Sequence, residues 1–256
     1  MKIIDKILKI YTIIIGFIIY LPIIILIIFS FNESRSKIVF TGFTLDNYFK
    51  LMVNFRVWEA FYNSIWTALV VTIVSVFMAI ALGYAYVRFD FRGKDILDIL
   101  LLIPIIIPEI VESLTLLVFL IILNFPLSPY TVIIGHIAFD ISFAYVVIKA
   151  RFMGYDPQYE DAARTLGADE FKAFRRVTLP LIMPGVIVAA LIAFVQSYDD
   201  FIKTFFTRPA GFYTLPVYIW SLASRRGFSL DLNALATFIV GLSILFAIIR
   251  NRVEKW

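Results

Sequence analysis

The segment Glu160-Asp-Ala-Ala-Arg-Thr-Leu-Gly167, which continues through Ala168 to Leu179-Pro180, is a polar stretch between two strongly apolar ones. Apolar segments make up most of the remaining chain: 61% of the residues are hydrophobic, only 16% are charged, and the mean hydropathy is +0.91. This composition is far from that of a soluble domain and indicates a membrane protein. In such a protein, a polar segment of this length is a natural place to meet a soluble partner.

Six apolar runs are long enough to cross about 30 Å of hydrocarbon as helices, which requires about 20 residues each. None alternates like a strand of an outer-membrane barrel, so we expect helices, whose backbone groups are satisfied internally. The first run is too long for a signal peptide and lacks a cleavage pattern, so we expect it to remain uncleaved. The predicted fold class is an all-α membrane protein with one transmembrane domain over residues 1–256. The runs cover approximately residues 10–31, 61–87, 96–123, 130–150, 181–198 and 233–249.

The basic residues predict the orientation of these spans. With six crossings, 15 of the 23 lysines and arginines fall on the side of the termini and of the loop over residues 151–179, and the other eight, including Lys203, fall in loops on the opposite side. Because basic residues accumulate on the cytoplasmic side, we expect both termini and this loop to be cytoplasmic. The net charge of +4 gives no case for nucleic acid, and the absence of cysteine excludes disulfides and thiolate metal sites, so no metal is expected.

Within the 151–179 loop, the local signals predict a helix-turn-helix. Asp156-Pro157 suits a helix start, and the chain then runs without a breaker from Gln158 to Leu166. Gly167 suits a left-handed cap, and a second short helix is expected from Asp169 to just before Pro180. That second helix would carry Phe171, Phe174 and Val177 on one side. Spacing alone leaves two roles open, a docking element for another protein or an amphipathic loop on the lipid surface.

The loop resembles the cytoplasmic signature of importer permeases of the ATP-binding-cassette superfamily, in which Glu-Ala-Ala, three residues, Gly, nine residues, Ile, one residue and Leu-Pro form the pattern. Here Asp161-Ala-Ala163, Gly167, Val177 and Leu179-Pro180 occupy those positions, with Asp161 replacing Glu and Val177 replacing Ile. The resemblance implies a type I (MetI-like) importer fold whose coupling helix docks into a cytoplasmic ATPase. The residues implied at that contact are Glu160, Asp161, Ala162, Ala163, Arg164, Gly167, Leu179 and Pro180. Whether Asp161 or Glu160 makes the acidic contact stays open.

The same resemblance implies the partners and the location. A dimer of ATP-binding subunits would hold ATP and Mg, a second related permease chain would supply the other coupling loop, and an extracytoplasmic binding protein would deliver substrate. The chain would lie in the plasma (inner) membrane, in contact with lipid, and would bind no cofactor itself. It carries no phosphate-binding loop, so ATP hydrolysis must occur on a partner.

Further segments are similar to the polyamine-importing branch of this family. They occur in the same order as in that branch, although each is weak alone, and they lie at residues 40–48, 86–94, 197–201 and 233–237. The resemblance implies spermidine or putrescine as substrate. Because the branch also includes other systems, ferric iron, thiamine and other small organic ions remain alternatives.

Acidic residues in or near the spans are candidates for the substrate path, because charge at membrane depth is costly and usually functional. Glu109 and Glu112 share a helix face after two prolines, Pro104 and Pro108, that should kink the third span. Acids without matching basic residues would favour cations, and Tyr198 could add cation–π attraction. His136 is expected to be a hydrogen-bonded core residue, and an interfacial position for the two glutamates stays open. The candidate path comprises Glu109, Glu112, Asp140, Tyr198, Asp199 and Asp200.

Two other classes of function have little support. An intramembrane hydrolase would need a recognisable motif, and neither His-Glu-x-x-His nor Gly-x-Ser-x-Gly occurs in the chain. An ion-coupled secondary carrier often shows two similar halves, and no convincing internal repeat is present. A carrier would also leave the 151–179 loop without a role. We therefore expect a transport subunit and not an enzyme.

Overall fold

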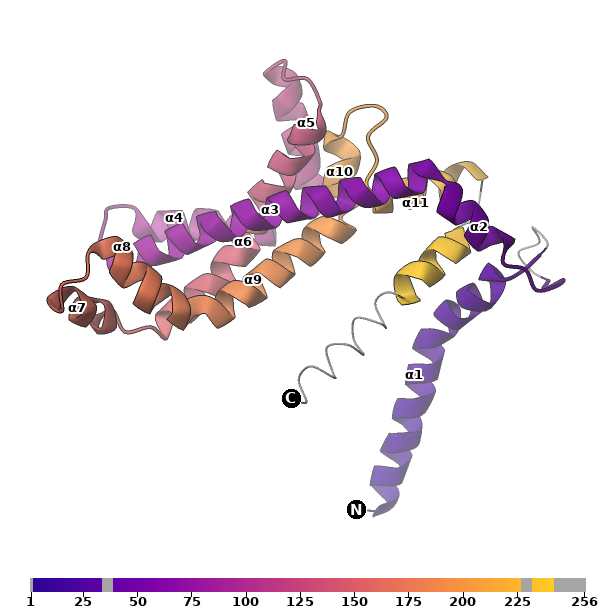
Figure 1. The fold of residues 1–256 in the computed structure, drawn as a ribbon, viewed down its shortest axis with the longest axis horizontal. Coiled ribbons are helices and arrows are strands. Elements are labelled where there is room, and N and C mark those ends of the chain that lie inside the picture. The colour runs from indigo at the N-terminus through magenta and orange to yellow at the C-terminus, as the bar shows by residue number, and fades with distance from the viewer. Residues whose placement is uncertain (1, 34–38, 227–231, 242–256) are drawn as a thin grey trace. The chain divides into compact units, whose positions relative to one another are not determined.

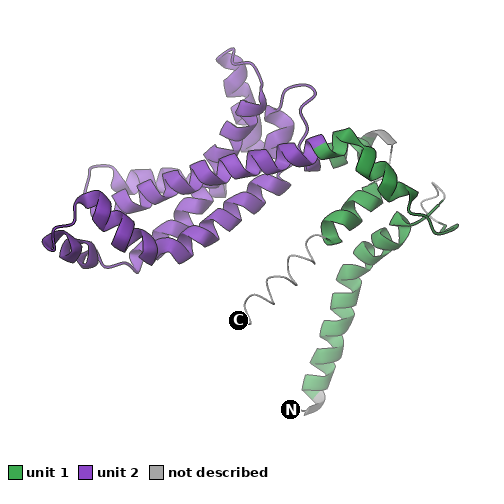
Figure 2. Cartoon of the chain, viewed as in Figure 1, with its two compact units in different colours: residues 1–58, 218–256 green, residues 59–217 purple. Residues whose placement is uncertain are grey.

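The computed structural model describes residues 2–33, 39–226 and 232–241. Helices dominate these residues (Figure 1). The chain divides into two compact units, residues 1–58 with 218–256, and residues 59–217 (Figure 2). The helices are α1 (Lys2–Ser30), α2 (Asp46–Val53), α3 (Phe55–Arg88), α4 (Lys94–Ile106), α5 (Glu109–Ile122), α6 (Pro129–Met153), α7 (Gln158–Thr165), α8 (Glu170–Ala173), the π-helical turn η1 (Phe174–Thr178), α9 (Leu179–Asp199), α10 (Ile202–Thr207) and α11 (Leu215–Arg226).

Helices α3, α6 and α9 form the core of the larger unit. Small residues let them approach closely: Ala79, Ala144 and Ala189 are each fully buried, one on each helix. Tyr145, Ile148 and Phe152 of α6 fill the space between them. Helix α6 is buried around most of its circumference, whereas α3 and the segment that ends with α9 bury only 33% and 28% of their most apolar windows.

Among the described residues, four helices are long and apolar enough to cross a membrane, and five if a bent pair counts as one span. Four of the predicted runs correspond to α1, α3, α6 and α9. The fifth predicted run, 96–123, is not one straight span, because α4 and α5 meet at an angle of 108°. The break lies at Ile107, which is extended because Pro108 disfavours helical geometry in the residue before it. Pro104 lies inside α4 and does not interrupt it.

The sixth predicted run is only partly described. An apolar helix covers Leu232–Gly241, whereas residues 242–249 of the predicted span lie outside the described residues. In the same unit, α1 buries none of its most apolar window against the rest of the chain. At its end, the amide of Asn47 donates to the carbonyls of Ser30 (3.0 Å) and Asn32 (3.1 Å), which ties α2 to the exit of α1.

The predicted stop before Pro180 is wrong, because α8, η1 and α9 form one continuous helical segment over Glu170–Asp199. Proline lacks an N–H, so it is tolerated in a first helical turn, and the wider π-helical turn directly precedes it. Phe171, Phe174 and Val177 lie three residues apart in this helical segment and so share one side, as predicted, but that side is not the buried one. Phe171 is exposed, and Ala173 and Thr178 are the buried residues of this segment.

Candidate functional site

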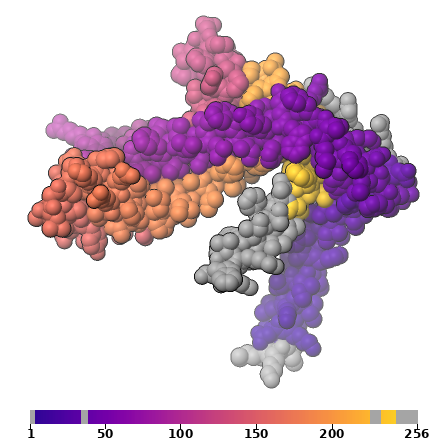
Figure 3. Space-filling view, viewed as in Figure 1, coloured from indigo at the N-terminus to yellow at the C-terminus, as the bar shows by residue number. Residues whose placement is uncertain are grey.

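The 151–179 loop folds as an exposed tip built from α7, α8 and η1 at one end of the larger unit (Figure 3). Helix α7 begins one residue later than predicted, with Pro157 as its N-cap, but the Asp156 carboxylate still accepts from the Gln158 N–H at 2.9 Å. Asp169 caps α8 by accepting from the Lys172 N–H at 2.8 Å. The capping signals of the sequence thus predict the two helix starts to within one residue.

Gly167 ends α7 in the left-handed conformation, with φ of +92°. Its N–H donates to the Arg164 carbonyl (2.9 Å), and the Ala168 N–H donates to the Ala163 carbonyl (3.1 Å). This pair of bonds is a Schellman motif, which satisfies carbonyls that the helix end leaves open. No atom lies within 4 Å of the position that a Cβ on Gly167 would occupy. The requirement for glycine at this turn is therefore one of backbone conformation and not of space.

Glu160 is buried, with an exposed fraction of 1%, although it was expected at the ATPase contact. Its carboxylate accepts hydrogen bonds from the Tyr84 hydroxyl (2.7 Å) and the Thr178 hydroxyl (2.7 Å), and the Tyr155 hydroxyl lies 3.3 Å away. These partners come from the end of α3, from η1 and from the segment before α7. Glu160 therefore fastens α7 to the end of α3 and to η1.

Asp161 faces outward, and its carboxylate accepts a hydrogen bond from the guanidinium of Arg88 at the end of α3. That hydrogen bond holds the pKa of Asp161 below its usual range. Because its pKa is depressed, the Asp161 carboxylate stays ionised through the pH range in which an ordinary aspartate titrates. The ion pair is lost only as the pH falls through the lowered pKa. At neutral pH the pair is intact, and Asp161, not Glu160, offers its carboxylate at the surface.

The outer face of α7 is apolar and has no cover within the described residues. Tyr159 is 60% exposed and Leu166 is 90% exposed, and Ala162, which lies between them on the same face, is also exposed. Three- and four-residue spacings place these side chains side by side on one helix face. Tyr159 and Leu166 were missed from the sequence, where the predicted contact in this helix and its turn comprised Glu160 to Arg164 and Gly167. The signal available in the sequence was their spacing, because Tyr159 lies three residues before Ala162 and Leu166 lies four residues after it.

The remaining predicted coupling residues lie at different depths. Ala163 is half-buried, and exposed Arg164 pairs with exposed Glu170 at 3.1 Å. Leu179 is half-buried and Pro180 exposed in the first turn of α9, outside the tip. The structure thus brings Asp161 to Gly167 together on the tip and places Leu179-Pro180 where the tip joins the membrane helix.

A second cluster of charges lies among α5, α6 and α10, the buried charge cluster. At its centre is Lys203 of α10, whose ammonium contacts Glu109 (2.7 Å) and Asp200 (3.0 Å). The same ammonium lies 4.0 Å from the ring centroid of Phe139. Lys203 is only 3% exposed. The cluster comprises Glu109, His136, Asp140, Asp200 and Lys203.

The predicted surplus of acids without a basic neighbour is wrong, because Lys203 pairs with two of them. The count of spans had placed Lys203 in an outer loop, because Lys203 follows the fifth predicted run, which ends at residue 198. Instead, the Asp200 carboxylate caps α10 by accepting from the Thr204 N–H (2.9 Å), which turns the chain back against α5 and α6. This cap brings Lys203 inside.

His136 is fully buried and hydrogen-bonded, as expected. Its Nδ1 contacts the Ser197 hydroxyl (2.8 Å), and its Nε2 contacts the Thr204 hydroxyl (2.9 Å) and lies 3.2 Å from Asp200. Asp140 is also fully buried, yet neither carboxylate oxygen has a hydrogen-bond partner among the residues that the structure describes. The cluster therefore contains one carboxylate that the described part of the chain leaves unsatisfied.

Not all predicted substrate-path residues belong to this cluster. Asp199 is exposed, and Tyr198 is half-buried and stacked on Phe194, with ring centroids 5.9 Å apart. Glu112 lines a cavity of about 340 Å³ together with Lys203. Most of the remaining lining is apolar and comes from α5 and α6, including Val111, Leu116 and Ala138. Among the described residues, no group of three or more acids, histidines or cysteines is arranged to hold a metal ion.

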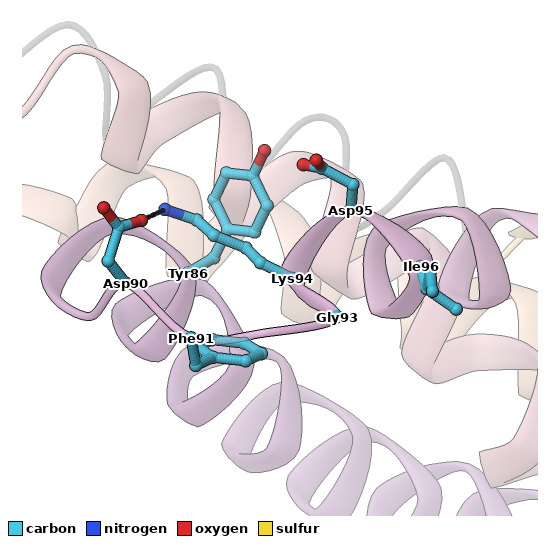
Figure 4. A pocket seen from close by; sticks show the side chains of 7 residues that line it. All are labelled: Tyr86, Asp90, Phe91, Gly93, Lys94, Asp95 and Ile96. Carbon is cyan, nitrogen blue, oxygen red and sulfur yellow. Dashed lines mark hydrogen bonds and ion pairs between the residues drawn. The ribbon is translucent and has the colours of Figure 1, made fainter.

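Another cavity, of about 430 Å³, lies at the turn between α3 and α4 (Figure 4). Lys94 pairs with Asp90 (3.4 Å), and its ammonium lies 4.7 Å from the ring centroid of Tyr86. Asp90 is fully exposed, so this pair contributes little stability. The contacts arrange the turn around Gly93, which has φ of +89°. The charged groups that line this cavity, Asp90, Lys94 and Asp95, are not buried, in contrast to Lys203.

The long apolar helices, the capped polar tip and the buried charges together define an inner-membrane transport component. The chain belongs to the family of binding-protein-dependent transport system inner membrane components, whose pattern matches residues 72–256. It is a permease component of an ATP-binding-cassette import system and not an enzyme.

Among individual proteins, the chain is similar to the spermidine/putrescine transport system permease protein PotC of Escherichia coli strain K12. The two are 35% identical over 236 residues, which are 92% of this chain and 89% of that protein. The putrescine transport system permease protein PotI of the same strain is 31% identical over 91% of this chain and 85% of its own length.

Solved structures show the same fold. A chain from a bacterial transporter that imports the acidic polysaccharide alginate superimposes with a TM-score of 0.74 over 100% of this chain and 96% of its own, at 16% identity. The alginate transporter in complex with a pentasaccharide-bound periplasmic protein gives a TM-score of 0.69 over 97% and 94%, at 18% identity. The MetI-like permease fold implied by the sequence is therefore confirmed at the level of the overall fold.

Proposed function

We propose that this chain is the permease subunit of an ATP-driven importer for polyamines such as spermidine and putrescine. The observation that carries the substrate class is its 35% identity, over 92% of the chain, to a spermidine/putrescine permease. The buried charge cluster adds chemical support, because it already holds one primary ammonium, that of Lys203, between carboxylates and an aromatic ring. Ferric iron, thiamine and other small organic ions are the alternatives that an uptake panel would distinguish.

In this proposal the chain crosses the membrane six times, with both termini in the cytoplasm. The broken pair α4 and α5 counts as one crossing, and residues 233–249 provide the last. The distribution of lysines and arginines supports the orientation, because the tip and the termini share the more basic side. Broken helices are tolerated at membrane depth where they line a protein interior, and the break after Ile107 lies beside the 340 Å³ cavity.

The tip is proposed to be the coupling helix, docked in a cleft of a cytoplasmic ATPase subunit. The exposed apolar face of α7, with Tyr159, Ala162 and Leu166, would enter the cleft, and the Asp161–Arg88 pair would border it. One chain has one such tip, so a dimer of ATPase subunits, holding ATP and Mg, would require a second related permease chain. A binding protein would deliver substrate on the opposite side. ATP binding would draw the two tips together and turn the substrate cavity outward.

The docking proposal is tested at Leu166, the exposed apolar residue at the C-cap of α7. We expect Leu166→Asp to abolish co-purification of the ATPase subunit with the permease, because a charge would be desolvated at a packed interface. Val53→Asp is the matched control, since Val53 is 84% exposed and lies far along the chain in α2. Retention of the ATPase by the Leu166 variant, or its loss in both, would reject docking through this face.

The two adjacent aspartates test the substrate route. Asp200→Asn removes the charge that pairs with Lys203, while its amide oxygen can still cap α10, so we expect assembled complex with polyamine uptake lowered at least about tenfold. Asp199→Asn changes an exposed carboxylate and is expected to retain most uptake. Initial rates of labelled spermidine uptake, normalised to assembled complex, measure both. Equal effects of the two substitutions would remove the buried cluster from the route.

A further inference from the structure

The environment of the Lys203 ammonium has the features of a binding site for an alkylammonium ion. The ammonium is held by two carboxylates, Glu109 at 2.7 Å and Asp200 at 3.0 Å, and by the face of Phe139 at 4.0 Å. Carboxylates combined with an aromatic face are a combination that attracts organic ammonium groups. Lys203 is 3% exposed, so these contacts are made away from solvent, where each is stronger than at the surface.

The site has more acceptor capacity than one lysine uses. Asp140 is fully buried, and both its oxygens are without a hydrogen-bond partner among the described residues. Its carboxylate lies within electrostatic range of Lys203, Asp200 and Glu109, so it belongs to the same site. A buried carboxylate without a partner is costly, and such a group indicates a ligand that the chain does not itself supply.

The cavity beside Lys203 has the complementary shape and polarity. It encloses about 340 Å³ and is lined mainly by apolar side chains, among them Val111, Leu116 and Phe119. Its charged groups are Lys203 and Glu112, and Glu112 has one carboxylate oxygen that is buried and unpaired within the described residues. An alkyl chain would contact the apolar walls, while an ammonium group at its end would lie beside Glu112 and Lys203, the two charged groups that line the cavity.

We propose that Lys203 is a built-in stand-in for a substrate ammonium: it occupies the acid site of Glu109, Asp140 and Asp200 while no substrate is bound, and a primary alkylammonium entering from the adjacent cavity displaces it. The inference deepens the proposed import of polyamines and rests on that function. The exchange replaces one ammonium with another, so Glu109 and Asp200 keep a cationic partner throughout. Lys203 would thereby act as a positioning residue. It keeps the empty site from collapsing, and its return to the site prevents the transported ammonium from being retained.

Removing the lysine side chain tests the exchange without any transport assay. In the assembled complex in detergent, Lys203→Ala should be stabilised by millimolar n-butylammonium chloride, with a melting temperature higher by about 3 °C or more. The wild-type complex, in which Lys203 fills the site, should shift by much less. The neutral analogue n-butanol should stabilise neither. A butylammonium shift that is absent, equal in the wild type, or matched by butanol would overturn the proposal.

A second variant keeps the test decisive if Lys203→Ala does not assemble. Methionine reaches about as far as the lysine stem and leaves only the ammonium position empty, so Lys203→Met should be stabilised by methylammonium and not by methanol. Adding Glu109→Gln to either variant should remove most of the shift, since Glu109 is the nearest carboxylate at 2.7 Å. Persistence of the full shift in the double variant would also overturn the proposal.

These outcomes are separable from those of the proposed function. An amine-specific shift in a complex that imports no polyamine would retain the ammonium site and reject polyamine import. Polyamine import by the wild-type complex, without an amine-specific shift in the Lys203 variants, would reject the stand-in alone.

Discussion

Gly167→Val is expected to lower ATP-driven uptake roughly 10- to 30-fold while leaving the chain in the membrane. Gly167 has φ of +92°, a conformation that costs a residue with a Cβ about 1–2 kcal/mol, and more for a β-branched side chain. Because nothing lies within 4 Å of the added Cβ, this penalty acts on the turn alone and shifts the tip away from its docked conformation. Initial uptake rates, normalised to the amount of membrane-inserted chain, give the effect.

Gly93 provides a matched control for this substitution. It has φ of +89°, and likewise no atom lies within 4 Å of its hypothetical Cβ, but it belongs to the turn between α3 and α4. Gly93→Val therefore carries a similar backbone penalty outside the tip and should leave uptake close to that of the wild type. Normal uptake in the Gly167 variant, or the same loss in both, would contradict a coupling role for the tip.

The second large effect is expected at Glu160. Glu160→Ala would leave the part-buried hydroxyl of Tyr84 without its acceptor and the buried hydroxyl of Thr178 with only the Tyr155 hydroxyl as partner, at a cost of about 1–3 kcal/mol. Helix α7 would lose its hydrogen bonds to α3 and η1. We therefore expect a lower melting temperature of the complex and uptake reduced more than tenfold. Glu160→Gln keeps one oxygen acceptor in place and should retain much of both.

Glu170 supplies the comparison on the same loop. Its side chain is 79% exposed and pairs with Arg164 at 3.1 Å, and exposed pairs contribute about 0–1 kcal/mol. Glu170→Ala should therefore change neither stability nor uptake appreciably. If Glu160→Ala behaved like Glu170→Ala, the buried carboxylate would have no part in holding the tip.

The tip shows why some features could be predicted from the sequence. The helix starts near Asp156 and Asp169 and the turn at Gly167 depend on local chemistry, on side chains that cap and on a residue that tolerates positive φ. The burial of Glu160 depends on Tyr84, which is 76 residues away in the sequence. Periodicity within α7 alone cannot show which of two adjacent acids faces another helix.

The buried charge cluster shows the opposite case. The hydropathy of the sequence marked Glu109, Asp140 and Asp200 as unusual, but the count of spans placed Lys203 in an outer loop. The error arose because α10 has only six residues, too few to form an apolar span, and packs against α5 and α6 through long-range contacts. The 108° break between α4 and α5 was foreseen only as a kink at the prolines. Proline predicts a break, but packing against other helices sets its angle.

Uptake into proteoliposomes tests the central claim most directly. The purified complex, with its ATPase subunits and binding protein, would be reconstituted with ATP enclosed on the ATPase side and supplied with labelled spermidine, putrescine, thiamine or ferric iron outside. The account predicts saturable accumulation of spermidine or putrescine that requires ATP and the binding protein and falls roughly 10- to 30-fold in Gly167→Val. Accumulation of thiamine or ferric iron without the polyamines, or polyamine uptake that does not depend on ATP, would contradict it.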